Sequence, residues 1–122
     1  MKIAVVGSRE FKEEGLILDI LSSELTPGDT LISGGARGVD TFAEEALSAI
    51  NQGYAPDGQI SKHIFKPDWD KYGKRAGFLR NELIINEADK VIAFWDGESK
   101  GTKHSIDLAI KAGKPIDIYV RK

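Results

Sequence analysis

Three short segments rich in glycine each follow an apolar run of the sequence, at residues 7–9, 34–38 and 96–102. Glycine accepts positive φ angles and has no Cβ, so a ligand can approach the backbone N–H groups of such a segment. The second and third segments also precede helical patterns, and the unpaired N–H groups at a helix N-terminus favour an anion. These residue types therefore indicate a site for a phosphate or pyrophosphate group.

Polar side chains within these segments would support the same chemistry. Hydroxyl donors and cations occur in them: Ser8, Ser99, Thr102, Arg9, Arg37 and Lys100. The alternative is that glycine turns and Ser/Thr caps only connect strands to helices, since capping needs the same residue types. There is no G-x-G-x-x-G, and residues 97–103 are one residue short of a P-loop, with Thr-Lys in place of Lys-Ser/Thr. ATPase chemistry is therefore not indicated.

A fourth segment, residues 66–81, combines aromatic side chains with five basic groups. Trp69 and Tyr72 are suited to stacking on a base, with Lys71, Lys74 or Arg80 near a phosphate. The alternative is that Trp69 covers the core and that the lysines are solvated.

Five further polar residues are candidates for the site or for its support. Arg80 and Asn81 place a guanidinium beside an amide, a pair that can orient an anion or brace an adjacent loop. Asp40 has two open roles, ligand contact or stabilisation of its helix N-terminus. His104 lies two residues after Thr102 but is expected to be solvated and not catalytic, and His63 is expected to be structural.

The elements that must position these residues alternate between strands and helices. Short β-branched runs predict strands at residues 2–6, 30–33, 63–66, 90–95 and 116–120. Apolar residues at steps of three and four predict helices at residues 16–25, 42–50, 76–87 and 102–112. In the last two helices we expect the buried faces to include Leu79, Leu83 and Ile84, and Ile106, Ala109 and Ile110, respectively.

This alternation predicts an α/β fold, a single doubly wound, Rossmann-like domain over residues 1–122. Right-handed crossovers favour a five-stranded, mainly parallel sheet in the order 3-2-1-4-5, with helices on both faces. Strands one, two and four are then neighbours, so the three glycine segments meet at the carboxyl edge of the sheet. The loop at residues 51–61 is expected to be peripheral, at the opposite edge.

Composition sets the outer limits. The chain has 122 residues, 41% of them hydrophobic and 30% charged, which suits one packed domain. It has no cysteine and no apolar run of about 20 residues, so we expect a cytoplasmic protein that meets no membrane. Residues 1–61 carry four Lys/Arg and ten Asp/Glu, while residues 62–122 carry thirteen and nine. The second half can therefore form a local basic patch.

The motifs taken together resemble the SLOG superfamily, most closely its YspA-like branch, which is related to YpsA. The resemblance rests on residues 5–11, on 34–40, on D-W-x-x-Y-G-x-x-A-G-x-x-R-N from 68 to 81, on Ala93-Phe94-Trp95 and on Gly101-Thr102. It implies a nucleotide-type ligand between the 34–40 and 97–102 segments, with residues 7–9 and Arg80 adding contacts.

Two branches of the superfamily suggest other activities. LOG phosphoribohydrolases carry P-G-G-x-G-T-x-x-E, and this chain is similar except that Ser105 stands at the glutamate position. A hydroxyl cannot stabilise an oxocarbenium-like transition state as a carboxylate would, although Asp40, Glu82, Asp96 or Glu98 are alternative carboxylates. Residues 33–38 also resemble the glycine loop of DprA, which binds single-stranded DNA. However, the first half of the chain is acidic and is poorly suited to neutralising the phosphates of a long DNA strand.

The sequence therefore predicts a module that binds or senses a nucleotide or a nucleotide-derived ligand. The first alternative is an N-glycosidase acting on nucleoside 5'-monophosphates, and the second is DprA-like binding of single-stranded DNA. We expect no metal and no required cofactor, a small-molecule nucleotide as partner and a homo-oligomer, with nucleic acid as the less favoured partner. The candidate ligand-binding residues are Gly7, Ser8, Arg9, Gly34, Gly35, Ala36, Arg37, Gly38, Asp40, Trp69, Lys74, Arg80, Asn81, Asp96, Gly97, Ser99, Gly101 and Thr102.

Overall fold

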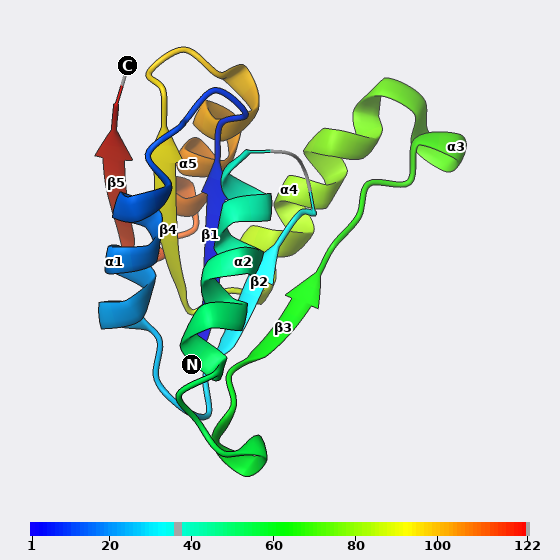
Figure 1. Ribbon diagram of the computed structural model, residues 1–122. Coiled ribbons are helices and arrows are strands. Elements are labelled where there is room, and N and C mark those ends of the chain that lie inside the picture. The colour runs from blue at the N-terminus through cyan, green and yellow to red at the C-terminus, as the bar shows by residue number, and fades with distance from the viewer. Residues whose placement is uncertain (36–37, 122) are drawn as a thin grey trace.

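The sheet holds five parallel strands in the order β3-β2-β1-β4-β5 (Figure 1). This architecture comes from a computed structural model that describes residues 1–35 and 38–121. The strands are β1 Lys2–Gly7, β2 Thr30–Ser33, β3 Ser61–Ile64, β4 Lys90–Trp95 and β5 Ile116–Val120. The predicted fold class and strand order are confirmed.

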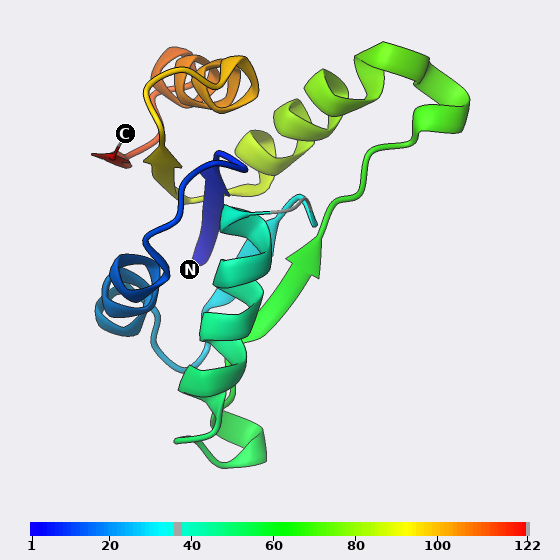
Figure 2. The same cartoon turned by 45° about the horizontal axis from the view of Figure 1, so that its top comes forward.

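Helices cover both faces of the sheet (Figures 1 and 2). On one face lie α1 (Glu14–Glu24) and α2 (Val39–Asn51), and on the other lie α4 (Ala76–Glu87) and α5 (Lys100–Lys111). A short arm between β3 and α4 contains α3 (Trp69–Tyr72) and the 3-10 turn η2 (Gly73–Arg75). A second 3-10 turn, η1 (Pro56–Gly58), lies at the opposite end of the molecule within the predicted peripheral loop. No helix of the described residues is long and apolar enough to span a membrane.

The central strand β1 separates two hydrophobic cores. Ile3 and Val5 pack against α1 and α2, whereas Ala4 and Val6 pack against α4 and α5. A strand buried on both faces reads as a continuous apolar run, which is why β1 and β4 are recognisable from sequence. The rigid centre of the sheet thus carries the turns that follow β1 and β4.

Strand β3 begins two residues earlier than the sequence predicts. Its partner β2 is short, and the register pairs Thr30 with Ser61 and Ser33 with Ile64. The N–H of Phe65 still donates to the carbonyl of Ser33 at 2.8 Å, after which no residue of β2 remains for pairing. Pairing therefore fixes β3 on a polar stretch, where apolarity alone placed it on residues 63–66.

Two expected core residues are on the surface. The Leu83 side chain is 55% exposed and that of Ile110 is 61% exposed, so their predicted place on the buried faces was wrong. Each helix buries polar residues instead: Asn81 in α4, and Thr102 and Ser105 in α5. Ile84, Ile106 and Ala109 are buried as predicted, so each buried face combines apolar residues with polar ones.

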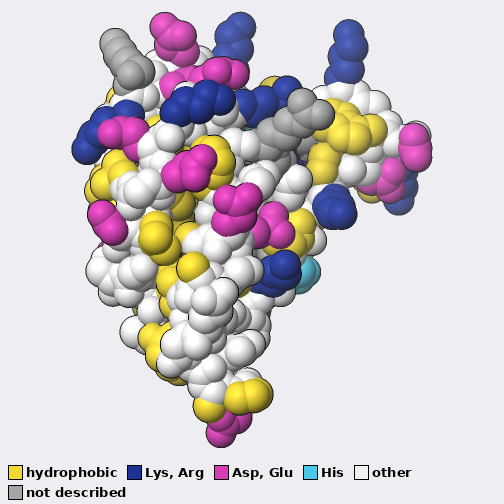
Figure 3. Space-filling model, viewed as in Figure 1, with side chains coloured by type: hydrophobic (Ala, Val, Ile, Leu, Met, Phe, Trp, Pro, Cys, Tyr) yellow, Lys and Arg dark blue, Asp and Glu magenta, His cyan; other side chains and the backbone are white. Residues whose placement is uncertain are grey.

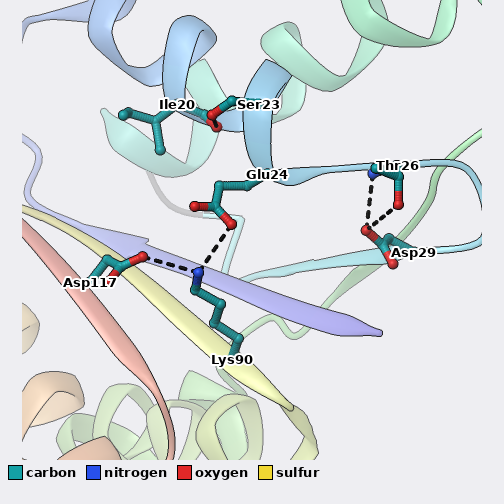
Figure 4. A network of polar contacts seen from close by, with 7 residues as sticks. All are labelled: Ile20, Ser23, Glu24, Thr26, Asp29, Lys90 and Asp117. Atoms are coloured by element: carbon teal, nitrogen blue, oxygen red, sulfur yellow. Dashed lines mark hydrogen bonds and ion pairs between the residues drawn. The ribbon is translucent and has the colours of Figure 1, made fainter.

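An ion-pair network closes the opposite, amino-terminal edge (Figure 4). The Nζ of Lys90 lies 3.0 Å from a carboxylate oxygen of Glu24 and 3.0 Å from one of Asp117. Hydrogen bonds to Glu24 and to Asp117 raise the pKa of Lys90. Nearby, Asp29 accepts hydrogen bonds from the backbone N–H and the hydroxyl of Thr26. The network ties the end of α1 to β4 and β5.

We expect Lys90→Met to lower the free energy of unfolding by about 1 kcal/mol at neutral pH, because one cation partly shielded from solvent serves two carboxylates. Since the pKa of Lys90 is raised, this contribution is present at neutral pH and is lost only as the pH rises above the ordinary lysine range. Urea denaturation measures the change. The control is Lys103→Met, which removes an exposed pair with Asp107 and should cost about 0.3 kcal/mol. Equal losses for both variants would contradict a role for the network.

Candidate functional site

An open cleft lies at the carboxyl edge of the sheet, where the turns after β1, β2 and β4 meet the first half of α4. Its volume is about 870 Å³. The described residues that line it are Val5, Val6, Gly7, Arg9, Glu10, Gly34, Gly35, Asp40, Lys66, Pro67, Trp69, Arg80, Asn81, Ile84, Asp96, Glu98, Ser99, Gly101, Thr102 and Ser105. The expected meeting of three separate glycine segments around one hollow is therefore present.

Ser8 fastens the turn after β1 to the turn after β4. Its backbone N–H donates to the carbonyl of Phe94 at 3.1 Å. Its hydroxyl accepts from the N–H of Asp96 at 3.2 Å and lies 3.2 Å from the hydroxyl of Thr102. Ser8 is 1% exposed, so it holds the floor of the site together from beneath and does not face the cleft.

The turn after β4 is filled in part by its own aspartate. One carboxylate oxygen of Asp96 accepts from the N–H groups of Ser99 and Glu98, both at 2.8 Å. These hydrogen bonds lower the pKa of Asp96, so it is ionised at neutral pH, and their contribution to stability is lost only as the pH falls through that lowered pKa. An incoming anion therefore finds these two donors already occupied.

Two donors remain open at the start of α5. Ser99 caps the helix by accepting from the N–H of Thr102 at 3.3 Å. The backbone N–H groups of Lys100 and Gly101 donate to no residue in the described part of the chain. These N–H groups at a twelve-residue helix, together with its dipole, are suited to one anionic group.

Arg80 braces the turn after β2. Its Nη1 donates to the carbonyl of Gly34 at 2.9 Å and its Nε donates to Oδ1 of Asn81 at 3.0 Å. Burial lowers the pKa of Arg80, and the nearby charge of Asp40 acts in the opposite direction. Of the two roles open from sequence, bracing an adjacent loop is the one seen here.

The hydrogen bond from Arg80 also orients the residues behind it. Because a guanidinium only donates, Oδ1 of Asn81 must face it and the amide nitrogen of Asn81 faces His104, 3.3 Å from Nδ1. His104 also packs edge-on against Phe78, with ring centroids 4.7 Å apart. His104 is therefore a half-buried supporting residue, not the solvated one expected from sequence.

Close packing explains two of the glycines. Gly38 has a φ of +78°, and a Cβ there would lie 2.6 Å from Cα of Arg9 and 2.8 Å from the carbonyl oxygen of Ser8. Gly7 has a negative φ, and a Cβ there would lie 2.6 Å from the carbonyl oxygen of Phe94 and from Val39. Both glycines let the turns approach one another, so they shape the site without being reserved for a ligand.

Charge is mixed around the cleft. Its described cations are Arg9, Lys66 and Arg80, and its described acids are Glu10, Asp40, Asp96 and Glu98. Asp96 is turned into its own loop, and Glu10 and Glu98 are exposed. Figure 3 shows both signs of charge side by side along this upper edge. The site therefore favours a compact anion held by backbone donors over a long polyanion.

Twelve of the predicted site residues line the cleft: Gly7, Arg9, Gly34, Gly35, Asp40, Trp69, Arg80, Asn81, Asp96, Ser99, Gly101 and Thr102. Ser8 and Gly38 lie behind it, and Lys74 and Gly97 are outside its lining. Ala36 and Arg37 fall outside the described residues. The Trp69 side chain is 57% exposed, so the alternative in which it covers the core was wrong.

Sequence reasoning did not assign several lining residues to ligand binding. They are Val5, Val6, Glu10, Lys66, Pro67 and Ile84, together with Glu98 and Ser105, which were considered only for sugar chemistry. Lys66 was recognisable, because it follows a predicted strand at the same edge as the glycine segments. The apolar members were hidden, because a residue at the end of a buried strand looks the same whether or not it borders a cavity. The described residues contain no group of three or more side chains that could hold a metal ion.

In sequence, the chain is similar to the DNA recombination-mediator protein A family and to a phage protein. The profile of the DNA recombination-mediator protein A family matches residues 1–66, slightly more than half of the chain. The Gene 61 protein of Mycobacterium phage D29 is 36% identical over 120 residues, which cover 94% of this chain and 93% of the relative.

Two solved structures are similar in fold. DNA processing protein A from Helicobacter pylori, described for its single-stranded DNA binding mode, has a TM-score of 0.68 at 22% identity over 100% of this chain. This chain spans only 66% of that protein's length. The molybdenum cofactor binding protein of Rippkaea orientalis has a TM-score of 0.64 at 21% identity, covering 99% of this chain and 77% of that one.

Proposed function

Because the chain belongs to the DNA recombination-mediator protein A family, we propose that its cleft binds a nucleotide or a nucleotide-derived ligand. One observation carries the proposal: the cleft of about 870 Å³ is lined on one side by Gly101, at the open N-terminus of α5, and on another side by an exposed tryptophan. That volume lies in the range of small-molecule sites.

The phosphate end of the ligand is assigned to the start of α5. The free N–H groups of Lys100 and Gly101 supply two directed donors, and Arg9 and Lys66 supply positive charge from neighbouring turns. Because Asp96 already occupies the N–H groups of Glu98 and Ser99, this end has room for a single phosphate group. A monophosphate, or one phosphate of a longer ligand, fits this donor set.

The base end is assigned to Trp69. Trp69 lines the cleft from the α3 arm. In both ribbon views this arm lies apart from the start of α5 (Figures 1 and 2). An indole that is 57% exposed beside a cleft offers a face to any base, which is a means of binding tolerant of base identity.

The prediction that tests this assignment is Trp69→Ala. We expect a loss of nucleotide affinity of about fivefold to 100-fold, the usual range for one base on an aromatic side chain. The free energy of unfolding should stay the same, because the side chain is largely solvated. Isothermal titration calorimetry against nucleoside monophosphates gives the affinity.

The matched control for that variant is Tyr72→Ala. Tyr72 is in the same arm, is 44% exposed and does not line the cleft. Its removal should leave the affinity unchanged. Equal affinities for the wild type and Trp69→Ala would overturn the assignment of the base end.

Single-stranded DNA is the second candidate ligand, favoured by the family and by the subject of the Helicobacter pylori structure. Titration of a thymidine oligonucleotide and of a nucleoside monophosphate at two salt concentrations separates the candidates. For a compact ligand with one bound phosphate, the logarithm of the binding constant should fall with the logarithm of the salt concentration with a slope near 1 in magnitude. For a bound strand, the slope grows with each phosphate contact. Tighter binding of the oligonucleotide with a steep slope would favour the strand over the free nucleotide.

A further inference from the structure

Strand β5 forms an open edge of the sheet. Among the described residues it pairs with β4 alone. The N–H of Arg121 donates to the carbonyl of Trp95 at 3.0 Å, so the alternate residues Asp117 and Tyr119 direct their backbone groups towards β4 as well. The N–H and C=O groups of Ile118 and Val120 therefore point away from the sheet.

The residues whose backbone groups point away from the sheet, Ile118 and Val120, have apolar side chains. The side chains of Ile118 and Val120 are each 42% exposed. They alternate with Tyr119, which packs in the α1 and α2 core, so they lie on the α5 face. Helix α5 adds Ile110, which is 61% exposed. The edge strand and the helix beside it thus leave an apolar row unpartnered.

The other edge of the same sheet is protected. Strand β3 exposes Ser61, Lys62 and His63, and a charged or polar edge discourages pairing with another chain. On β5 the charged residues Asp117 and Arg121 face α1, where they contact Lys90 and Glu13, respectively. No charge interrupts the apolar row itself.

We infer that this edge pairs with the β5 edge of a second copy of the chain, antiparallel and around a twofold axis at Tyr119. In that register Ile118 of each copy lies opposite Val120 of the other, and these are the residues whose backbone groups are directed outwards. Each Ile118 and Val120 pair exchanges two backbone hydrogen bonds, so two five-stranded sheets join into one. The inference goes beyond the proposed function and does not depend on what the cleft binds.

Charge complementarity selects this register. With the axis at Tyr119, Asp117 of one copy lies opposite Arg121 of the other, on the α1 face. With the axis at Ile118, Asp117 would lie opposite Tyr119, and no acid of the second copy would face Arg121. In the single chain Nη1 of Arg121 donates to the carbonyl of Val120 at 2.7 Å, so the arginine covers the acceptor that the second copy would use. Pairing adds the carboxylate of Asp117 from the second copy to that of Glu13, which already lies 3.1 Å from Nε of Arg121.

Sedimentation velocity of the purified full chain over a range of concentrations tests the inference. The wild type should show a dimer whose fraction rises with concentration. Val120→Lys places an ammonium group in the apolar row of both copies and should weaken the dimer by about tenfold or more. Leu18→Lys, at an apolar α1 position that is 39% exposed, is the control and should leave the dimer intact.

A second variant tests the register. Arg121→Glu places the new glutamate of each copy opposite Asp117 of the other. The repulsion should weaken the dimer, and added salt should partly restore it. A wild type that is monomeric at every concentration would overturn the inference. So would a dimer that survives both Val120→Lys and Arg121→Glu but dissociates on Leu83→Lys, which would place the interface on α4.

Discussion

Replacing Gly38 with alanine is expected to lower the free energy of unfolding by about 3 kcal/mol or more. Gly38 has a φ of +78° and a ψ of −123°, a combination outside the left-handed region that an L residue can occupy. Its Cβ would also lie 2.6 Å from Cα of Arg9, a backbone atom that cannot move away without displacing the turn after β1. Chemical denaturation measures the loss.

Gly28 provides the matched control for this experiment. It too has a positive φ, +95°, but a Cβ there would meet no atom within 4 Å. Gly28→Ala should therefore cost only the backbone penalty, about 1–2 kcal/mol. A loss at Gly38 no larger than the loss at Gly28 would show that crowding against Arg9 is not the reason for the glycine.

The elements were predictable wherever burial on both sides leaves a clear pattern. Strands β2, β4 and β5 have the predicted bounds, and α4 begins and ends where its period indicated. Strand β3 was misplaced because its position depends on pairing with β2, a long-range contact that leaves no mark in local apolarity. Leu83 and Ile110 were wrongly predicted to be buried, because the helical period does not show which polar residues will be buried beside a polar cleft.

The site was predictable as a meeting of turns but not in its internal contacts. Strand order alone placed Gly7, Gly34 and Gly101 around one hollow. Nothing in the sequence showed that Asp96 would accept hydrogen bonds from its own loop, because this depends on the conformation of a four-residue turn. The SLOG resemblance is confirmed at the level of its DprA-like relatives, and the YspA-like branch stays a prediction.

Arg80→Ala is expected to remove both stability and ligand binding. It leaves the carbonyl of Gly34 and Oδ1 of Asn81 without their charged donor, which should cost about 1.5–3 kcal/mol in the free energy of unfolding. Nucleotide affinity should also fall, because the turn after β2 loses its brace and the cleft loses one of its cations. Arg80→Lys keeps the charge but cannot reach both acceptors with one planar group, so it should recover only part of the stability.

The lysine variant separates bracing from direct contact with the ligand. If Arg80 acts by bracing Gly34, affinity and stability fall together in both variants, and Arg80→Lys binds the nucleotide more weakly than the wild type. If Arg80 acts only as a charge, Arg80→Lys restores the affinity while the stability stays low. We expect the first result, because the guanidinium of Arg80 donates hydrogen bonds to Asn81 and to Gly34 within the protein. Arg75→Ala, an exposed cation just before α4, should change neither quantity and serves as the control for lost positive charge.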